Sequence, residues 1–301
     1  MVKGIIHRMK RLSLFSILLA LVLLSACSSS TPTATLTPTN TVTPMPPTPT
    51  SLPMALRVNG EGILLSDYQA SLNRLIQAQT DQNITATPEE QKNQVLQNYI
   101  DQLLLAQAAI QAGYNVDDAA VQARIDLLIT EIGGVDQLTS WQTAYGYTDE
   151  SFKAAERLEM LAIWQRDQII NAVPVTAEQI HAQQMLFQDE ANANAAYQKL
   201  QDGMNFAELA LIYDPVLGGD IGWFARGGLT QPDVEAAAFA LQPGEYSQVI
   251  KSSFGYHIIY VIDRETQHPL SVEARRNLQL QALTKWLEDA RAASTIEILV
   301  Q

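Results

Sequence analysis

The spacing of apolar residues changes at Pro174, and this change limits the chain to a fold with two different parts. From Met54 to Val173, apolar residues recur at helical spacing over long segments. After Pro174, short segments of alternating polarity are separated by glycine-rich turns such as the one at residues 218–222. We therefore expect an α+β protein in which a mainly helical domain over residues 54–173 precedes a domain of mixed strands and helices.

The first part opens with a hairpin and continues as helices. Asn59-Gly60 is typical of a tight turn between two short strands, and Ser66 is expected to cap a helix over residues 67–79. A proline and acidic residues after Thr87 predict a second helix that runs to Gly113. Three more helices are expected, one opening at residues 117–118 and two over residues 135–144 and 149–171. We interpret their apolar stripes as core, because they carry no His or Cys at metal-ligand spacing.

The second part alternates short strands with helices. Strands are expected over residues 182–188, 249–252 and 254–261, with a further strand after the glycine-rich turn. Helices are expected over residues 190–201, 206–213 and 232–241. An amphipathic segment at residues 271–293 and a short apolar run at residues 296–300 follow.

The first 26 residues have the pattern of a signal peptide. Four basic residues precede an apolar run over residues 12–24, which is too short to span a bilayer comfortably. The segment Leu24-Ser25-Ala26-Cys27 places a small-residue cleavage site before the only cysteine of the chain, and it resembles the lipobox of bacterial lipoproteins. The resemblance implies that Cys27 becomes a lipidated N-terminus that anchors the protein outside the cytoplasm, on the cell membrane. The alternative is a structural thiol, although a lone cysteine is unusual in an exported protein.

Residues 27–53 form a tether in this interpretation. They are mostly Ser, Thr and Pro, so they cannot bury enough apolar surface to offset the entropy of ordering. An extended linker that holds the folded part away from the lipid is expected, and a glycosylated stalk is a compatible variant.

The charge of the chain excludes one class of partner. Removal of residues 1–26, with four positive and no negative charges, takes the formal net charge from −13 to −17. A basic nucleic-acid footprint is absent, whereas weak attraction to basic unfolded polypeptides is permitted. No phosphate-binding glycine loop or metal-ligand cluster is present in the sequence, so neither a cofactor nor a metal is expected.

Five motifs in residues 204–263 carry a family resemblance. In order they read Phe206-Ala207-Glu208-Leu209-Ala210, Gly219-Asp220-Ile221-Gly222-Trp223-Phe224, Ala238-Phe239-Ala240-Leu241, Pro243-Gly244-Glu245 and Phe254-Gly255-Tyr256-His257-Ile258-Ile259. Together they resemble a parvulin-type peptidyl-prolyl isomerase domain, also named PpiC or rotamase. The resemblance implies a small antiparallel sheet flanked by helices over residues 174–267.

The wider organisation resembles the SurA and PrsA group of extracytoplasmic foldases. The opening Val58-Asn59-Gly60-Glu61, the helices after it and the segment after the parvulin-like part carry this resemblance. It implies an N-terminal helical chaperone domain to which residues 268–301 return, with residues 296–300 pairing with residues 56–58. It also implies that the partners are unfolded or folding exported polypeptides that contain X-Pro bonds.

The implied reaction is rotation about an X-Pro amide, whose resonance sets a barrier of about 18–20 kcal/mol. No bond is broken, so neither a nucleophile nor a metal is needed. A catalyst must bind the twisted amide more tightly than either planar form. An apolar slot for the proline ring with a weakly polar surround for the carbonyl can do this.

The resemblance assigns roles to individual residues. His257 shares a strand face with Ile259 and Val261, and the family pattern places it in a polar cluster beside Ser252. The alternative for His257 is a core histidine whose ring is satisfied by a backbone carbonyl. The family's apolar slot positions correspond to Ile221, Leu229, Val234 and Phe239. Val234 stands where phenylalanine is common, so a wider slot is expected, and ordinary core packing would explain each of the four taken alone.

Two departures from the family pattern bear on activity. Gln184 stands where the family has a histidine, so His257 lacks its usual partner; His181 and His268 are expected at the surface. The segment around Asp214 is shorter than the family's loop, and Asp214 is expected either to join the polar site or to brace the turn.

Two functions from different classes are compatible with these residues. The first is a working prolyl isomerase, with possible reduced activity, that assists the folding of exported proteins. The alternative is a catalytically weak or inactive holdase chaperone that keeps the parvulin shape to bind unfolded clients. A passive surface adhesin on a stalk is a third, weaker interpretation.

Overall fold

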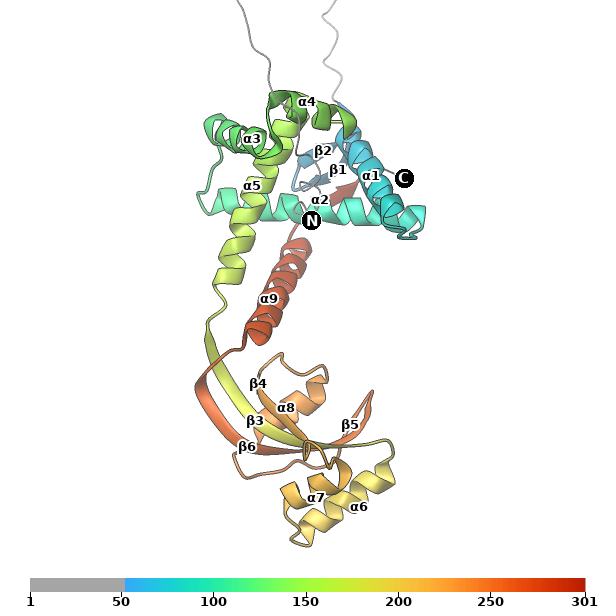
Figure 1. The fold of residues 1–301 in the computed structure, drawn as a ribbon, viewed down its shortest axis with the longest axis vertical. Coiled ribbons are helices and arrows are strands. Elements are labelled where there is room, and N and C mark those ends of the chain that lie inside the picture. Colours follow the sequence, from blue (N-terminus) through green and yellow to red (C-terminus); the bar gives the residue numbers. More distant parts are fainter. Residues whose placement is uncertain (1–51, 301) are drawn as a thin grey trace, which may run out of the picture.

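The structure is a computed structural model that describes residues 52–300. It is elongated, with a helical domain at one end and a sheet domain at the other (Figure 1). The signal peptide, Cys27 and most of the tether lie outside the described residues. Within residues 52–300, no helix is long and apolar enough to cross a membrane.

The helical domain is organised around a small sheet in the order β2-β1-β7. β1 (Met54–Val58) and β2 (Glu61–Leu64) form the expected hairpin, in which both turn residues, Asn59 and Gly60, have positive φ. β7 (Ile296–Ile298) pairs with the other edge of β1, so that Leu56 lies opposite Ile298 and Val58 opposite Ile296. The strand pairing inferred from the family resemblance is thus present in the structure.

Three of the five helices in residues 54–173 begin at a capping side chain. The five are α1 (Leu65–Asp81), α2 (Pro88–Gln111), α3 (Asp118–Ile132), α4 (Val135–Ala144) and α5 (Asp149–Asn171), and the three are α2, α3 and α5. Thr87 with Glu90, and Thr148 with Ser151, form capping boxes that start α2 and α5. The prediction for Ser66 is wrong, because α1 begins one residue before it with Leu64 at the N-cap and no side-chain cap. The strand β2 leads directly into α1, which leaves Ser66 inside the first turn.

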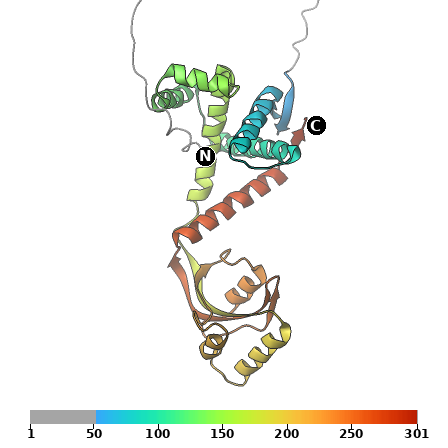
Figure 2. The ribbon, with the colours of Figure 1, turned by 45° about the vertical axis from the view of Figure 1, so that its right-hand side comes forward.

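The C-terminal segment completes the core of the helical domain. α9 (Val272–Ala292) runs from the sheet domain to the helical domain and packs beside α5 and α2 (Figure 2). Trp286, Ile296 and Val300 pack against the buried cluster that contains Leu56 and Leu103. Arg291 near the end of α9 also forms an ion pair with Asp101 of α2.

The second domain is an antiparallel sheet with helices on both faces. Its strand order is β4-β3-β6-β5, formed by β4 (Asp220–Ala225), β3 (Thr176–Phe187), β6 (Gly255–Pro269) and β5 (Ile250–Ser252). α6 (Glu190–Gln201) and α7 (Phe206–Tyr213) pack on one face, where Leu209 and Phe206 meet Met185 and Ile258. α8 (Pro232–Ala240) packs on the other face against Ile180, Ile259 and Val261.

Two strands are longer than the sequence patterns predict. β3 begins at Thr176 rather than at residue 182, and β6 continues to Pro269 rather than ending at residue 261. The extra residues pair with each other as a ribbon that leads to α5 and α9, with register shifts near Ala177 and His181. Most of these residues are polar and either partly buried or exposed, so backbone pairing stabilises the ribbon and the residues show little apolar alternation.

Candidate functional site

The imidazole of His257 is buried and both of its nitrogens are within hydrogen-bond distance of a partner. Its side chain lies in the middle of the sheet on β6, and the residue is 2% exposed. Ser252 Oγ lies 2.6 Å from Nε2, and Gln184 Oε1 lies 3.1 Å from Nδ1. The neighbouring strands β3 and β6 therefore bring Gln184 to His257, 73 positions away, while Ser252 on β5 is only 5 positions from His257.

The partners of His257 determine its tautomer. The Gln184 oxygen can only accept, so Nδ1 carries the proton and donates it to this oxygen. Nε2 then accepts from the Ser252 hydroxyl, whose oxygen in turn accepts the N–H of Phe254 at 3.0 Å. Burial lowers the pKa of His257 below its ordinary value, which favours the same neutral ring.

Asp214 braces a loop and stands apart from the His257 network. Its carboxylate accepts the backbone N–H groups of Val216 (3.2 Å), Leu217 (3.1 Å) and Gly219 (3.1 Å). The bonds from Leu217 and Gly219 lower the pKa of the Asp214 carboxyl most strongly. Within the described residues no hydrogen bond joins Asp214 to Gln184 or His257. Of the two roles left open by the sequence, this geometry favours the brace.

A pocket of about 280 Å³ opens beside Gln184. Its lining includes Ile221, Leu217, Tyr213 and Asp214. Gly219 has a φ of +72°, and a Cβ there would overlap the carbonyl oxygen of Gln184. The carbonyl of Gly219 accepts a hydrogen bond from the Gln184 N–H at 2.8 Å. Glycine therefore lets the loop lie directly against β3, where it forms one wall of the pocket.

The predicted proline slot is partly surface and partly core. Ile221, Leu229, Val234 and Phe239 all belong to the apolar cluster between the sheet and α8. Ile221 and Leu229 are half-buried, and Phe239 is 5% exposed. Val234 is 0% exposed and packs in the interior of the same cluster, so the wider slot stays a prediction.

Local hydrogen bonds and a strand irregularity position the two half-buried slot residues. The N–H groups of Gly227 and Leu229 donate to the carboxylate of Glu235 on α8, at 2.8 and 3.0 Å. Ile221 lies at a shift in the β3–β4 register, where it has no directly opposed residue. Such a bulge redirects a side chain relative to the regular strand.

The prediction that His181 and His268 are surface residues needs correction. Their rings stack on Trp223 with centroids 5.5 and 4.1 Å from its ring. Their side chains are only 26% and 25% exposed, and they pair with Asp220 and Glu265 at 2.9 and 2.8 Å. This cluster was missed because His181 and Trp223 are cross-strand partners only when β3 extends towards its N-terminus.

Two families match separate parts of the chain. Residues 175–263 match the PPIC-type PPIase domain, and residues 50–139 match the SurA-like N-terminal domain. The chain combines these two domains. Within residues 52–300, no group of three or more His, Cys, Asp or Glu residues is placed to hold a metal ion.

Two curated relatives are similar to parts of the chain. The chain is 35% identical over 127 residues to the foldase protein PrsA of Geobacillus sp. (strain WCH70), covering 40% of this chain and 45% of that protein. It is 30% identical over 192 residues to the foldase protein PrsA 2 of Bacillus cereus, covering 58% of this chain and 65% of that protein. The matches thus span about half to two thirds of these curated relatives.

A solved structure is also similar to this SurA-like and PPIC-type chain. The crystal structure of a peptidylprolyl isomerase, PrsA, from Bacillus cereus has 22% sequence identity with it and a TM-score of 0.44. The similarity covers 80% of this chain and 88% of that chain.

Proposed function

We propose that the chain is a peptidyl-prolyl cis-trans isomerase that acts on X-Pro bonds of unfolded or folding exported polypeptides. The observation that supports this function is the Ser252–His257–Gln184 network inside a PPIC-type PPIase domain. The buried ring of His257 is fully paired, and its partner Gln184 lines a pocket together with Ile221, one of the apolar slot residues.

The mechanism needs only shape and polarity. Ile221 and Leu229 are half-buried and can receive the proline ring, which places its amide near Gln184 and the network behind it. An amide twisted out of plane has lost part of its resonance, so it depends less on water than either planar form. Binding of this form lowers the barrier without proton transfer. His257 acts here as a positioning residue that holds Ser252 and Gln184.

A holdase function is the second candidate, and a surface feature favours it. α7 and the loop after it expose Leu211, Ile212, Val216 and Leu217, whose exposed fractions are 52%, 61%, 87% and 65%. A contiguous patch of exposed apolar residues is typical of protein interaction sites. Such a surface can hold an unfolded segment whether or not the neighbouring site catalyses rotation.

Measurement of X-Pro isomerisation distinguishes the two candidates. The full chain and its His257→Ala variant would be compared by NMR exchange on a short X-Pro peptide. Acceleration by the native chain that the variant loses supports the isomerase. No acceleration, together with suppressed aggregation of an unfolded client, would replace the isomerase proposal with the holdase.

We also propose that the protein is anchored by lipid on Cys27 and works outside the cytoplasm. The segment Leu24-Ser25-Ala26-Cys27 and the Ser/Thr/Pro-rich residues after it support this localisation. Cell fractionation tests it: the native chain is expected in the membrane fraction and Cys27→Ala outside it. A membrane-bound Cys27→Ala variant whose leader is cleaved would contradict the lipid anchor.

A further inference from the structure

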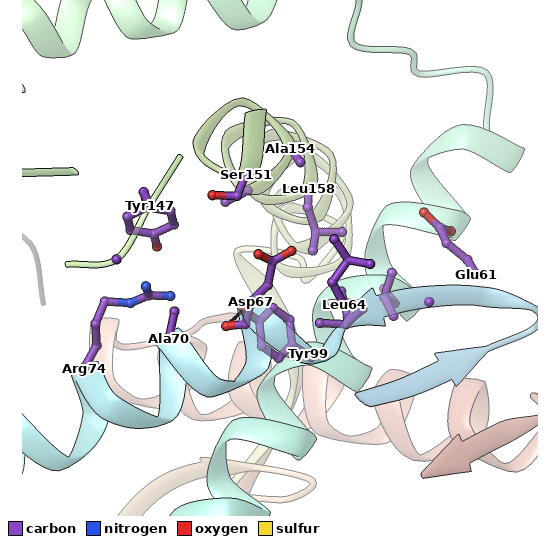
Figure 3. Close-up of a pocket in the computed structure, with 15 residues that line it drawn as sticks. Glu61, Leu64, Asp67, Ala70, Arg74, Tyr99, Tyr147, Ser151, Ala154 and Leu158 are labelled. Atoms are coloured by element: carbon purple, nitrogen blue, oxygen red, sulfur yellow. Dashed lines mark hydrogen bonds between the residues drawn. The ribbon is translucent and has the colours of Figure 1, made fainter. Parts of the chain in front are cut away.

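A second pocket lies in the helical domain, remote from the sheet domain. It has a volume of about 290 Å³ and opens between α1, α2 and α5 (Figure 3). Tyr99 and Leu103 of α2 line it, and Leu64 and Leu158 contribute further apolar surface. This volume is near the lower end of the range for ligand pockets in proteins, which begins at about 300 Å³.

The carboxylate of Asp67 points into the middle of this pocket (Figure 3). Among the described residues this carboxylate forms no hydrogen bond, whereas the backbone carbonyl of Asp67 accepts one from the Tyr99 hydroxyl at 3.2 Å. Within residues 52–300 the carboxylate forms no ion pair. Burial raises the pKa of Asp67, and Arg74 offsets this effect only in part. An incomplete charge balance of this kind favours a cationic ligand.

The nearby cation, Arg74, is held by other groups. Its guanidinium donates to the Tyr145 carbonyl at 2.7 Å and to Ser71 Oγ at 2.5 Å. It also lies over the Tyr147 ring, 4.2 Å from the centroid. Arg74 thus closes one end of the pocket and leaves the Asp67 carboxylate available to a ligand.

The remaining lining suits a long side chain with a positive end. Leu64, Leu103 and Leu158 can cover an aliphatic stem, and the Tyr99 ring adds an aromatic surface beside Asp67. Glu61 adds a second carboxylate at the rim. The only basic residue in the lining is Arg74, so an acidic side chain would meet uncompensated negative charge.

We propose that this pocket binds a Lys or Arg side chain of an unfolded polypeptide. The nature of the polypeptide rests on the proposed foldase function; the preference for a cation rests on the pocket itself. The acidic net charge of the chain adds attraction for basic segments. Because the pocket and the His257 network lie in different domains, one client can engage both, which raises the overall affinity (Figure 1).

Peptides without proline test the pocket independently of isomerisation. The full chain would be titrated by NMR with an unstructured peptide of Gly, Ser and Ala that carries one central lysine, and with its acetyl-lysine counterpart. Saturable binding of the lysine peptide is expected, with affinity about tenfold lower for acetyl-lysine and for Asp67→Asn. Asp81→Asn is the matched control, because it removes the same charge from an exposed position on α1 and is expected to bind normally.

The outcomes separate this proposal from the isomerase proposal. Equal binding by Asp67→Asn and the native chain, equal binding of both peptides, or no saturable binding would overturn the cation pocket. Ala154→Phe, which fills the pocket from α5, provides a second variant, and it is also expected to weaken lysine binding. Both variants should keep the native rate of X-Pro isomerisation. Lysine binding without any isomerisation would contradict the isomerase proposal and support the cation pocket.

Discussion

His257 shows how burial and partners set the state of a single residue. Its two nitrogens have an acceptor, Gln184, on one side and a hydroxyl, Ser252, on the other. A second proton would leave the Ser252 hydroxyl without its acceptor. Desolvation favours the neutral ring, and the network then determines which nitrogen carries its proton.

The lowered pKa of His257 predicts a pH dependence of stability. The unfolded chain takes up a proton near the ordinary histidine value of about 6.5, whereas the folded state resists it. The contribution to stability is therefore present above the ordinary value and is lost as the pH falls towards the lowered folded value. We expect the Tm of the sheet domain to fall more steeply between about pH 7 and pH 5 in the native chain than in His257→Gln. Calorimetry checks this, and equal slopes would contradict it.

Gln184 offers a second prediction at the residue scale. It occupies the position at which the resembled family has a histidine, and it accepts a hydrogen bond from His257. We expect Gln184→His to raise kcat/KM for an X-Pro peptide by on the order of fivefold, which corresponds to about 1 kcal/mol. Peptide isomerisation by NMR exchange measures the effect. An unchanged or lower rate would show that position 184 does not act in the site.

At the scale of elements, the loop after α7 depends on one carboxylate. Asp214 Oδ1 accepts the N–H groups of Val216 and Leu217, and Oδ2 accepts that of Gly219. Asp214→Asn can keep the first two bonds, whereas Asp214→Ala loses all three. If the residue is a brace, activity should fall strongly in the alanine variant and weakly in the asparagine variant. Equal losses in both would instead indicate that the negative charge acts in the site.

At the scale of the whole molecule, the C-terminal strand joins the two ends of the described chain. The Asn59 N–H donates to the Thr295 carbonyl at 2.8 Å, so Glu297 and Arg57 form the next hydrogen-bonded pair of the antiparallel ladder. The side chain of Glu297 is exposed, so a substitution that removes its backbone N–H weakens the strand pairing without altering the packing of the core.

This geometry predicts a domain-specific loss of stability. Glu297→Pro removes one ladder donor and should lower the free energy of unfolding of the helical domain by about 1–3 kcal/mol. Glu297→Ala keeps the N–H and serves as the control. Isomerisation of a short peptide should remain native in both variants, since the sheet domain is not changed. Chemical unfolding measures the difference, and equal stability of the two variants would contradict the prediction.

Local signals in the sequence determined the helices of this protein. The bounds of α4, α5, α6 and α7 agree with those predicted, because caps and helical periodicity reside in contiguous residues. The hairpin turn at Asn59-Gly60 was predictable for the same reason. Ser66 shows the limit of such signals: it has a capping side chain, but α1 continues directly from β2.

The tertiary structure alone decided how the site is assembled. The Gln184–His257 bond joins residues 73 positions apart, and the stack on Trp223 joins three separate strand segments. The burial of Val234 depends on the packing of α8 against the sheet, and the position of Asp67 in a pocket depends on several helices at once. Sequence patterns report which face of one element is apolar. Contacts among elements exist only after strand pairing and helix packing have brought distant residues together, so these features could not be read from local patterns.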